Sequence, residues 1–268
     1  MSHSTNKKTF PWQLGIFPLL ELALFILALN ANSYLLSFVF IVFGGVLLSF
    51  SIHIFFHECV HFRAKYSQAV NLIYTLFLGL PFDGYRVHHY NHHSHANSLE
   101  DFSSTWYRDD NNKKMPFSAC RYSFGWLRQL SSAIGEESPF NQELGDVTQI
   151  KARIGLQKIT LYVFCIALIF IWFKAFVLYI ALVYLGWFFS ALHNYGQHPP
   201  IIEERICTYA NKAYNVFFFN NGLHWEHHDK PWLSWNEIEI DNKSERISHA
   251  HLIEPCFKRN KSKEYQNG

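Results

Sequence analysis

Histidine is concentrated in three short segments of this chain, and the segments share one pattern of spacing. Within a segment the imidazoles stand three or four residues apart, a separation that brings side chains to one face if the backbone is helical. The histidines concerned are His57 and His61; His89, His92 and His93; and His224, His227 and His228. Each protonated imidazole disfavours protonation of the next, so a dense group favours the neutral form, which binds metals. The spacing therefore predicts a metal site to which all three segments contribute.

The number of histidines indicates how many metal ions such a site would hold. Neutral imidazole suits zinc, copper, iron and nickel, whereas a zinc site usually takes four ligands in all. The three segments supply eight histidines, and His198 is a candidate for a ninth. This set is too large for one zinc ion and sufficient for two metal ions. Paired iron beside a membrane would indicate activation of oxygen for attack on a lipid-like substrate.

Other residues near these segments are candidates for supporting roles. Four further histidines near the segments or the second apolar pair do not fit the spacing, namely His53, His88, His95 and His193. His53 lies in an apolar run and is expected to be an interior residue whose hydrogen bonds are satisfied. His88 and His95 are expected either to support the ligands through hydrogen bonds or to face solvent. The carboxylates of Glu58 and Glu226 are candidates to accept hydrogen bonds from ligand imidazoles.

Apolar runs of membrane-spanning length flank the histidine segments. Residues 12–29 and 34–56 form one pair, and residues 159–173 and 175–192 form another, with Lys174 between its members. A helix of about 20 apolar residues crosses a bilayer, so each pair predicts a transmembrane helical hairpin. Lys174 is expected to extend its ammonium group to water at the far turn of the second hairpin. The apolar run 69–82 is too short to span comfortably and predicts an interfacial or re-entrant helix.

These elements define the expected fold class and domain organisation. The chain is predicted to be an all-α integral membrane protein that forms a single domain over residues 1–268. A first hairpin (12–56) leads into a cytosolic region (57–158) that carries the first two histidine segments. A second hairpin (159–192) leads into a cytosolic cap (193–268) that carries the third segment.

The distribution of charge predicts the side of the membrane on which the histidines lie. Cytoplasmic segments of membrane proteins are rich in Lys and Arg. Here the N-terminal leader, residues 63–153 and the C-terminal tail hold nearly all of them, and the presumed outer turns hold only Lys174. All three histidine segments are therefore expected on the cytosolic side, where they can converge on one site. The net charge of +2 gives no reason to expect a nucleic acid partner, and the five widely separated cysteines indicate neither a disulfide framework nor a thiolate metal site.

The three segments, taken in order, resemble a known family. HECVH, then RVHHYNHHSHAN, then HWEHH, placed after paired membrane helices, are similar to the histidine boxes of the membrane fatty acid desaturase and hydroxylase superfamily. Those boxes have the forms H-x(3,4)-H, H-x(2,3)-H-H and H-x(2,3)-H-H. The resemblance covers roughly residues 12–235. It implies a non-haem di-iron centre on the cytosolic face, O2 as co-substrate and a fatty acyl chain as substrate.

The resemblance also implies a ligand set and a source of electrons. The ligands would be the eight box histidines and His198, because the superfamily uses a further histidine between the second hairpin and the last box. His198, in the sequence NYGQH, fits that place. The two electrons would come from a separate donor such as ferredoxin or cytochrome b5, since no fused cytochrome b5 signature is present.

Several alternatives remain open from the sequence. Desaturation, hydroxylation and ketolation all begin with removal of hydrogen from an unactivated carbon, and the R-x-x-H-x-x-H-H form of the second box favours desaturation. The first box also satisfies H-E-x-x-H, in which Glu58 would be the general base of an intramembrane zinc metalloprotease. That enzyme requires one further ligand, usually acidic, and has no use for the other two boxes. A histidine-rich metal transporter or sensor would place its ligands within the membrane helices, whereas these lie beyond the helix ends.

Overall fold

The structure, a computed structural model, describes residues 12–61, 67–126, 146–200, 206–209, 211–240 and 247–248. The N-terminal leader and most of the C-terminal tail, on which the predicted topology partly rests, lie outside these residues. Within the described part of the chain the protein is mostly α-helical, and four helices are long and apolar enough to cross a membrane. The predicted all-α class with four candidate spans is therefore confirmed.

The first two spans form a tightly packed pair. Helix α1 covers Ile16–Asn30, after the short 3-10 helix η1 (Trp12–Gly15), and helix α2 covers Tyr34–Phe50. The Ser33 side chain caps α2 by accepting a hydrogen bond from the Leu36 amide at 3.2 Å. Helix α2 continues without a break through a π-helical turn, η2 (Ser51–Phe56), into α3 (His57–His61). The first histidine segment is thus the end of the second span, and π-helical turns are common beside functional sites.

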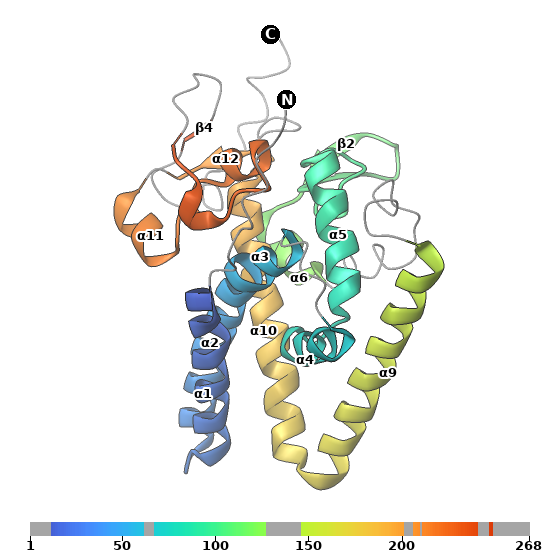
Figure 1. Cartoon of the computed structure of the whole chain (residues 1–268), viewed down its shortest axis with the longest axis vertical. Helices are drawn as coiled ribbons and strands as arrows, with labels where there is room; N and C mark the ends of the chain where they lie inside the picture. The colour runs from blue at the N-terminus through green and yellow to red at the C-terminus, as the bar shows by residue number, and fades with distance from the viewer. Residues whose placement is uncertain are drawn as a thin grey trace.

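The other two spans are longer than the apolar runs suggested. Helix α9 covers Val147–Ile171 and helix α10 covers Phe173–Gln197. Helix α9 begins before residue 159 because the Asp146 side chain caps its first turn, accepting a hydrogen bond from the Thr148 amide at 2.7 Å. Helix α10 packs along α2 at the close approach formed by Gly44, Gly45 and Gly186, where an added Cβ would meet leucine side chains within 3.0 Å. Helix α9 has no such seam and diverges from α10 (Figure 1).

Lys174 differs from its expected role at the far turn. Its Nζ donates a hydrogen bond to the carbonyl oxygen of Leu29 at 2.7 Å, in the last turn of α1. The ammonium group therefore supplies a hydrogen bond to a carbonyl in the last turn of α1, where a positive charge is favourable. The contact connects the two turns at the end of the helices that lies away from the histidines (Figure 1).

Two shorter helices connect the spans to the second histidine segment. Helix α4 covers Gln68–Leu78, ends at Gly79 in the left-handed region (φ 65°), and is too short to cross a membrane. Helix α5 covers Phe82–His95. Its first turn is fixed to α9 by Asp83, whose carboxylate accepts hydrogen bonds from Gln157 (2.6 Å), Arg86 (3.1 Å) and Arg153 (3.4 Å). This buried contact positions α5 so that its histidines lie above the membrane helices (Figure 1).

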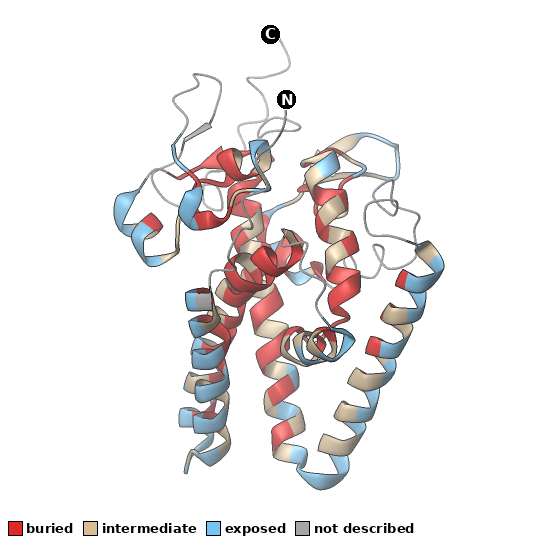
Figure 2. Cartoon of the chain, in the orientation of Figure 1, coloured by how far each residue is buried: buried red, intermediate tan, exposed pale blue. Residues whose placement is uncertain are grey.

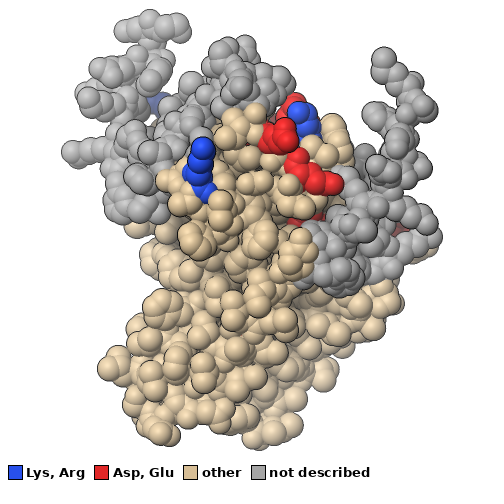
Figure 3. All heavy atoms as spheres, turned by 60° about the vertical axis from the view of Figure 1, so that its left-hand side comes forward, with Lys and Arg blue, Asp and Glu red and all other residues tan. Residues whose placement is uncertain are grey.

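The remaining described elements form a cap over one end of the helices. They are β1 (Trp106–Arg108), β2 (Lys114–Pro116), α6 (Ala119–Phe124), β3 (Cys207–Thr208), α11 (Lys212–Phe217), α12 (His224–Asp229), η3 (Trp235–Glu237) and β4 (Ile247–Ser248). Strands β1 and β2 pair antiparallel, and β3 and β4 pair parallel. Figure 2 shows that burial is concentrated in the cap and the upper helix ends, while the lower helix surfaces are exposed. In Figure 3 the described charged side chains of this face lie on the cap, and the face below them is free of charge.

Candidate metal centre

The nine histidines suggested by the sequence lie in two groups at the cap end of the helices. The first group is His57, His61, His89, His93 and His227, and the second is His92, His198, His224 and His228. Within each group one nitrogen of every ring lies within 4.8 Å of one nitrogen of every other. The groups adjoin, because the rings of His93 and His228 stack with centroids 4.2 Å apart.

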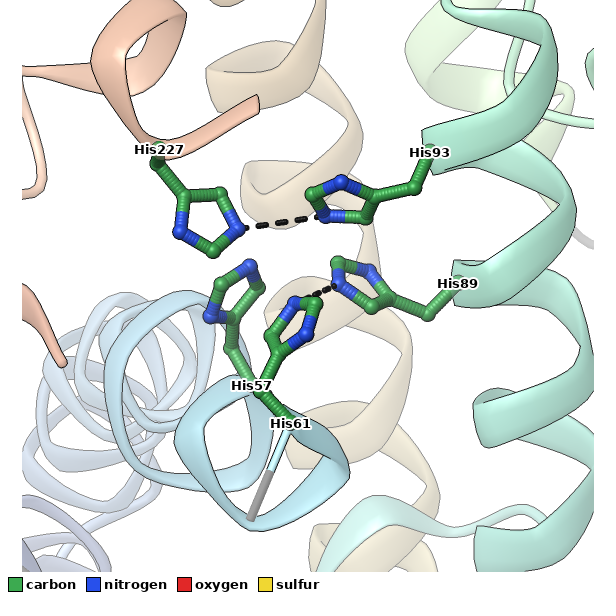
Figure 4. A group of neighbouring side chains, drawn as sticks. All are labelled: His57, His61, His89, His93 and His227. Carbon is green, nitrogen blue, oxygen red and sulfur yellow. Dashed lines mark hydrogen bonds between the residues drawn. The ribbon is translucent and has the colours of Figure 1, made fainter. Parts of the chain in front are cut away.

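The first group is assembled from three separate parts of the chain. In Figure 4 the imidazoles of α3, α5 and α12 point toward one another. The Nε2 atoms of His61 and His89 are 2.7 Å apart, and those of His93 and His227 are 3.1 Å apart. The His57 ring lies beside both pairs, with its centroid 4.4 Å from that of His227 and 4.5 Å from that of His89. Residues distant in sequence thus meet at one point.

The second group is built from α5, α12 and the end of α10. The Nε2 atom of His224 is 2.8 Å from that of His198 and 3.2 Å from that of His228. His92 completes the group, with its ring centroid 4.5 Å from that of His198. His198 follows the last residue of α10, and its carbonyl oxygen accepts hydrogen bonds from Thr105 Oγ1 (2.7 Å) and Asn97 Nδ2 (3.3 Å). These bonds hold the end of α10 to the turn after α5.

The helical turn divides the second and third boxes between the two groups, whereas both histidines of the first box lie in the first group. Residues four apart differ by about 40° around a helix and face one point, whereas a residue three positions on lies about 60° to the other side. His89 and His93 therefore share the first group, while His92 joins the second. His224 and His228 share the second group, while His227 joins the first. The expectation that the second and third boxes each present their three donors together was wrong.

The surroundings of the histidines favour the neutral form that binds metals. The pKa values of five of them fall well below the usual range, first because burial disfavours the charged ring and then because neighbouring imidazoles repel a second charge. They are His89, His93, His224, His227 and His228. At neutral pH each of these rings keeps a lone pair on one nitrogen.

Asp101 is a part of the site that sequence reasoning missed. Its Oδ2 accepts a hydrogen bond from Nδ1 of His92 at 2.9 Å, and the Asp101 side chain is fully buried. Burial, the largest single influence, raises the pKa of this carboxyl, but the contact with His92, the nearby His198 and the amide of Asn97 together lower the pKa on balance. The backbone N–H groups of Asn97 and Ser103 also donate to the carboxylate, each at 2.7 Å. With its proton on Nδ1, His92 directs the lone pair of Nε2 to the second group.

The arrangement of nitrogens fits bound cations. Several ring nitrogens are buried without a hydrogen-bond partner in the described structure: both nitrogens of His57, Nε2 of His92, and Nδ1 of His224 and His227. Four or five lone pairs converging on one point repel each other unless a cation lies between them. At metal–nitrogen distances of about 2.0–2.1 Å, adjacent ligand nitrogens stand about 3 Å apart, which is the range of the Nε2 separations in both groups. The donor sets suit two metal ions that accept nitrogen ligands.

A cavity extends from both groups into the helices. His57 and His89 of the first group and His92 and His224 of the second face it. Away from these histidines its wall contains the apolar and aromatic side chains of Ile52, Tyr85, Tyr122, Trp126, Trp187 and Ala191 and the polar side chains of Ser103, Ser190, Asn194 and Gln197.

Glu58 has a structural partner that bears on the protease alternative. Its Oε1 accepts a hydrogen bond from the backbone N–H of Trp235 at 2.6 Å, and the carboxylate is buried. The indole of Trp235 covers the first group, with ring centroids 4.5 Å from His227 and 4.9 Å from His57. A zinc protease would need an acidic third ligand beside His57 and His61, whereas three histidines fill those positions.

The four surplus histidines lie outside both groups. His53 is an interior residue, as predicted, whose Nε2 lies 3.0 Å from both the carbonyl oxygen and Oγ of Ser190. Its ring stacks on that of His193 at 4.1 Å. His88 Nε2 contacts Ser103 Oγ at 3.1 Å, and burial lowers the pKa of His88 to about 4. His95, in the last turn of α5, is only half-buried.

Four membrane-length helices and two groups of histidines at one of their ends define a membrane protein equipped to bind a pair of metal ions. The chain matches the fatty acid desaturase family over residues 32–240, a range that contains all nine histidines, and it belongs to that family. Membership indicates an oxidoreductase of the desaturase or hydroxylase type. A search of curated proteins gave no match, and a search of solved structures gave none.

Proposed function

We propose that the protein is a membrane-bound, O2-dependent fatty acyl desaturase that holds two iron ions in its two histidine groups. The observation that carries the proposal is the pair of adjoining all-histidine groups, which open into one cavity with apolar and aromatic side chains in its wall. Iron accepts imidazole nitrogen, and members of the family share the order of the three boxes. Two bound iron ions would supply the oxidising power by which O2 and two electrons remove hydrogen from an unactivated carbon.

The residues of the chain hold and shield this centre. The helix ends bring nine imidazoles to two points, and Asp101 keeps the proton of His92 on Nδ1. Trp235 covers the first group on one side, which limits access of water to the reacting atoms. The substrate chain lies in the cavity between α5 and α10, where Trp187 is fixed because its Nε1 donates to the carbonyl oxygen of Leu78 at 2.8 Å. Rigid walls restrict which carbon lies near the histidines.

The outcome of the reaction depends on where the substrate carbon stands. A second removal of hydrogen gives an alkene, while addition of oxygen gives an alcohol and then a ketone. Arg86, which gives the second box its desaturase-like form, contacts Asp83 at 3.1 Å and so has a structural role in either case. Desaturation remains the proposal on the resemblance of the boxes, and a hydroxylase or ketolase of the same family is the alternative that the product analysis distinguishes.

The proposed orientation places the histidine groups on the cytosolic side. Most described basic residues lie at the cap end of the helices, whereas Lys174 lies at the other end, as expected for a cytosolic cap. A separate one-electron carrier such as ferredoxin or cytochrome b5 would reach the centre from that side. We thus propose nine histidine ligands, two iron ions, O2 as co-substrate and a separate electron donor for this centre.

The proposal is tested by expression of the full chain in a host whose lipids are then profiled by mass spectrometry. We expect a new unsaturated acyl chain, dependent on O2, together with about two iron ions per purified chain. His228→Ala, which removes a donor from the second group, is the inactive control. A hydroxylated or keto product would establish the alternative chemistry. One zinc ion with no iron would contradict both.

A further inference from the structure

Helix α11 carries an apolar surface that the rest of the described cap does not cover. Val216 is 76% exposed and Phe217 is 73% exposed, although they adjoin the packed residues Phe218 and Phe219. The helix is short, from Lys212 to Phe217, and projects from the side of the cap beyond α1 and α2 (Figures 1 and 2). Two adjacent apolar side chains that are this exposed indicate a surface that contacts lipid or another protein.

The residues after α11 show its level relative to the membrane helices. Phe218 stacks on Phe50, the last residue of α2, with ring centroids 4.2 Å apart. Phe219 packs edge-on against Phe17, in the first turn of α1, at 5.9 Å. The C-terminal end of α11 is therefore fixed at the cap-side end of the first span and at the end of α2. The exposed apolar surface of α1 begins directly there, at Ile16 (45% exposed).

The composition of α11 fits the boundary between lipid headgroups and acyl chains. The helix contains no acidic residue, and Lys212 stands four residues before Val216, on the same face. A lysine in this position lays its methylenes along the apolar layer and places its ammonium among the headgroups. The apolar pair Val216 and Phe217, with the basic Lys212 beside it, is typical of a helix anchored at the membrane interface rather than of a loop exposed to water.

We propose that α11 is a membrane contact of the cap, in which Val216 and Phe217 enter the cytosol-facing leaflet beside α1. This contact would also position the third histidine box. Tyr214 of α11 lies with its hydroxyl 3.2 Å from Nε2 of His193 in α10. The chain between α11 and α12 is fixed by Asn221, whose Nδ2 donates to the carbonyl oxygen of His53 at 3.1 Å. Lipid on one side and α10 on the other thus hold the segment that carries α12 over the metal groups.

The test measures the depth of α11 in a bilayer with the full chain. The protein is placed in nanodiscs of phosphatidylcholine and phosphatidylglycerol, with Cys120, Cys165 and Cys256 replaced by serine. A nitroxide label is attached to Phe217→Cys, and its collisions with O2, which concentrates in lipid, are compared with those with a water-soluble nickel chelate. Leu19→Cys, exposed on α1, is the control for lipid. Asn111→Cys, in the hairpin loop between β1 and β2 at the far side of the cap, is the control for water.

We expect a ratio of O2 to nickel collisions several-fold higher at residue 217 than at residue 111, approaching the ratio at residue 19. Val216→Cys is measured as a second position and should give the same result. A ratio equal to that of Asn111→Cys would show that α11 faces water and would overturn the proposal. Protection from both reagents would show that another protein or a second copy of the chain covers α11, which would also overturn it. None of these outcomes depends on the identity of the metal or of the substrate.

Discussion

Replacement of Asp101 by asparagine tests how the protein prepares a ligand for its metal. The carboxylate is fully buried and accepts three hydrogen bonds, from His92 Nδ1 and from the amides of Asn97 and Ser103. An asparagine has one acceptor oxygen, so its NH2 group must face either His92 or a backbone N–H. If it faces His92, the proton of that ring moves to Nε2, which then has no lone pair for the second group.

The size of the effect follows from these contacts. Loss of a carboxylate that orients a ligand histidine typically weakens metal binding about 10–100-fold, or ~1.4–2.7 kcal/mol. If the asparagine turns its NH2 toward the backbone N–H instead, a buried donor is left without a partner, which costs about 1–3 kcal/mol of stability. Because His92 belongs to the second group alone, the first group should keep its ion.

The assay is a titration of the purified protein with an iron chelator, in which iron per chain is measured by mass spectrometry. The variant should release one ion at a chelator concentration about 10–100-fold lower than the wild type does, and the other ion at an unchanged concentration. Glu100→Gln is the matched control, since Glu100 is adjacent in sequence and accepts a hydrogen bond from Ser98 rather than from a ligand. Retention of both ions at wild-type chelator concentrations, with no loss of stability, would refute the argument that Asp101 sets the tautomer.

Three further results are expected. His198→Ala should lose the ion of the second group and all product, whereas His53→Ala, outside both groups, should keep its iron and measurable product; iron content and lipid profiles of the two variants decide this. Gly186→Ala should lower the free energy of unfolding by about 1–3 kcal/mol, because the added Cβ would stand 2.4 Å from a leucine side chain of α2. Gly155→Ala on α9 is the control and should not lower it, because no atom lies within 4 Å of the added Cβ. Thermal unfolding of both variants in the same detergent measures the difference. Ala191→Trp should fill part of the cavity and shift the products toward shorter acyl chains, and an unchanged chain-length profile would show that the substrate lies elsewhere.

The fold class, the number of spans and the histidines of the site could be predicted from the sequence. Hydropathy is a local property, so the apolar runs predicted all four long helices, although not the first three turns of α9, whose helical conformation depends on a polar cap at Asp146. The spacing of the boxes is equally local. The candidate ligands follow from it, with His198 supplied by the resemblance to a family of known chemistry.

Only the tertiary structure decided how these residues are combined. How the divided second and third boxes combine with each other and with the first box depends on where α3, α5 and α12 stand around one another, and no spacing within a single box contains that information. Asp101 lies beyond the end of α5 in a run of polar residues, and nothing in its neighbours distinguishes it until the turn at Asn97 folds it onto His92. The divergence of α9 and the exposed tip of α11 likewise follow from contacts between elements. Local sequence determines which elements form, whereas the positions of functional groups are set by packing across the chain, because that packing joins residues whose separation in sequence carries no regular pattern.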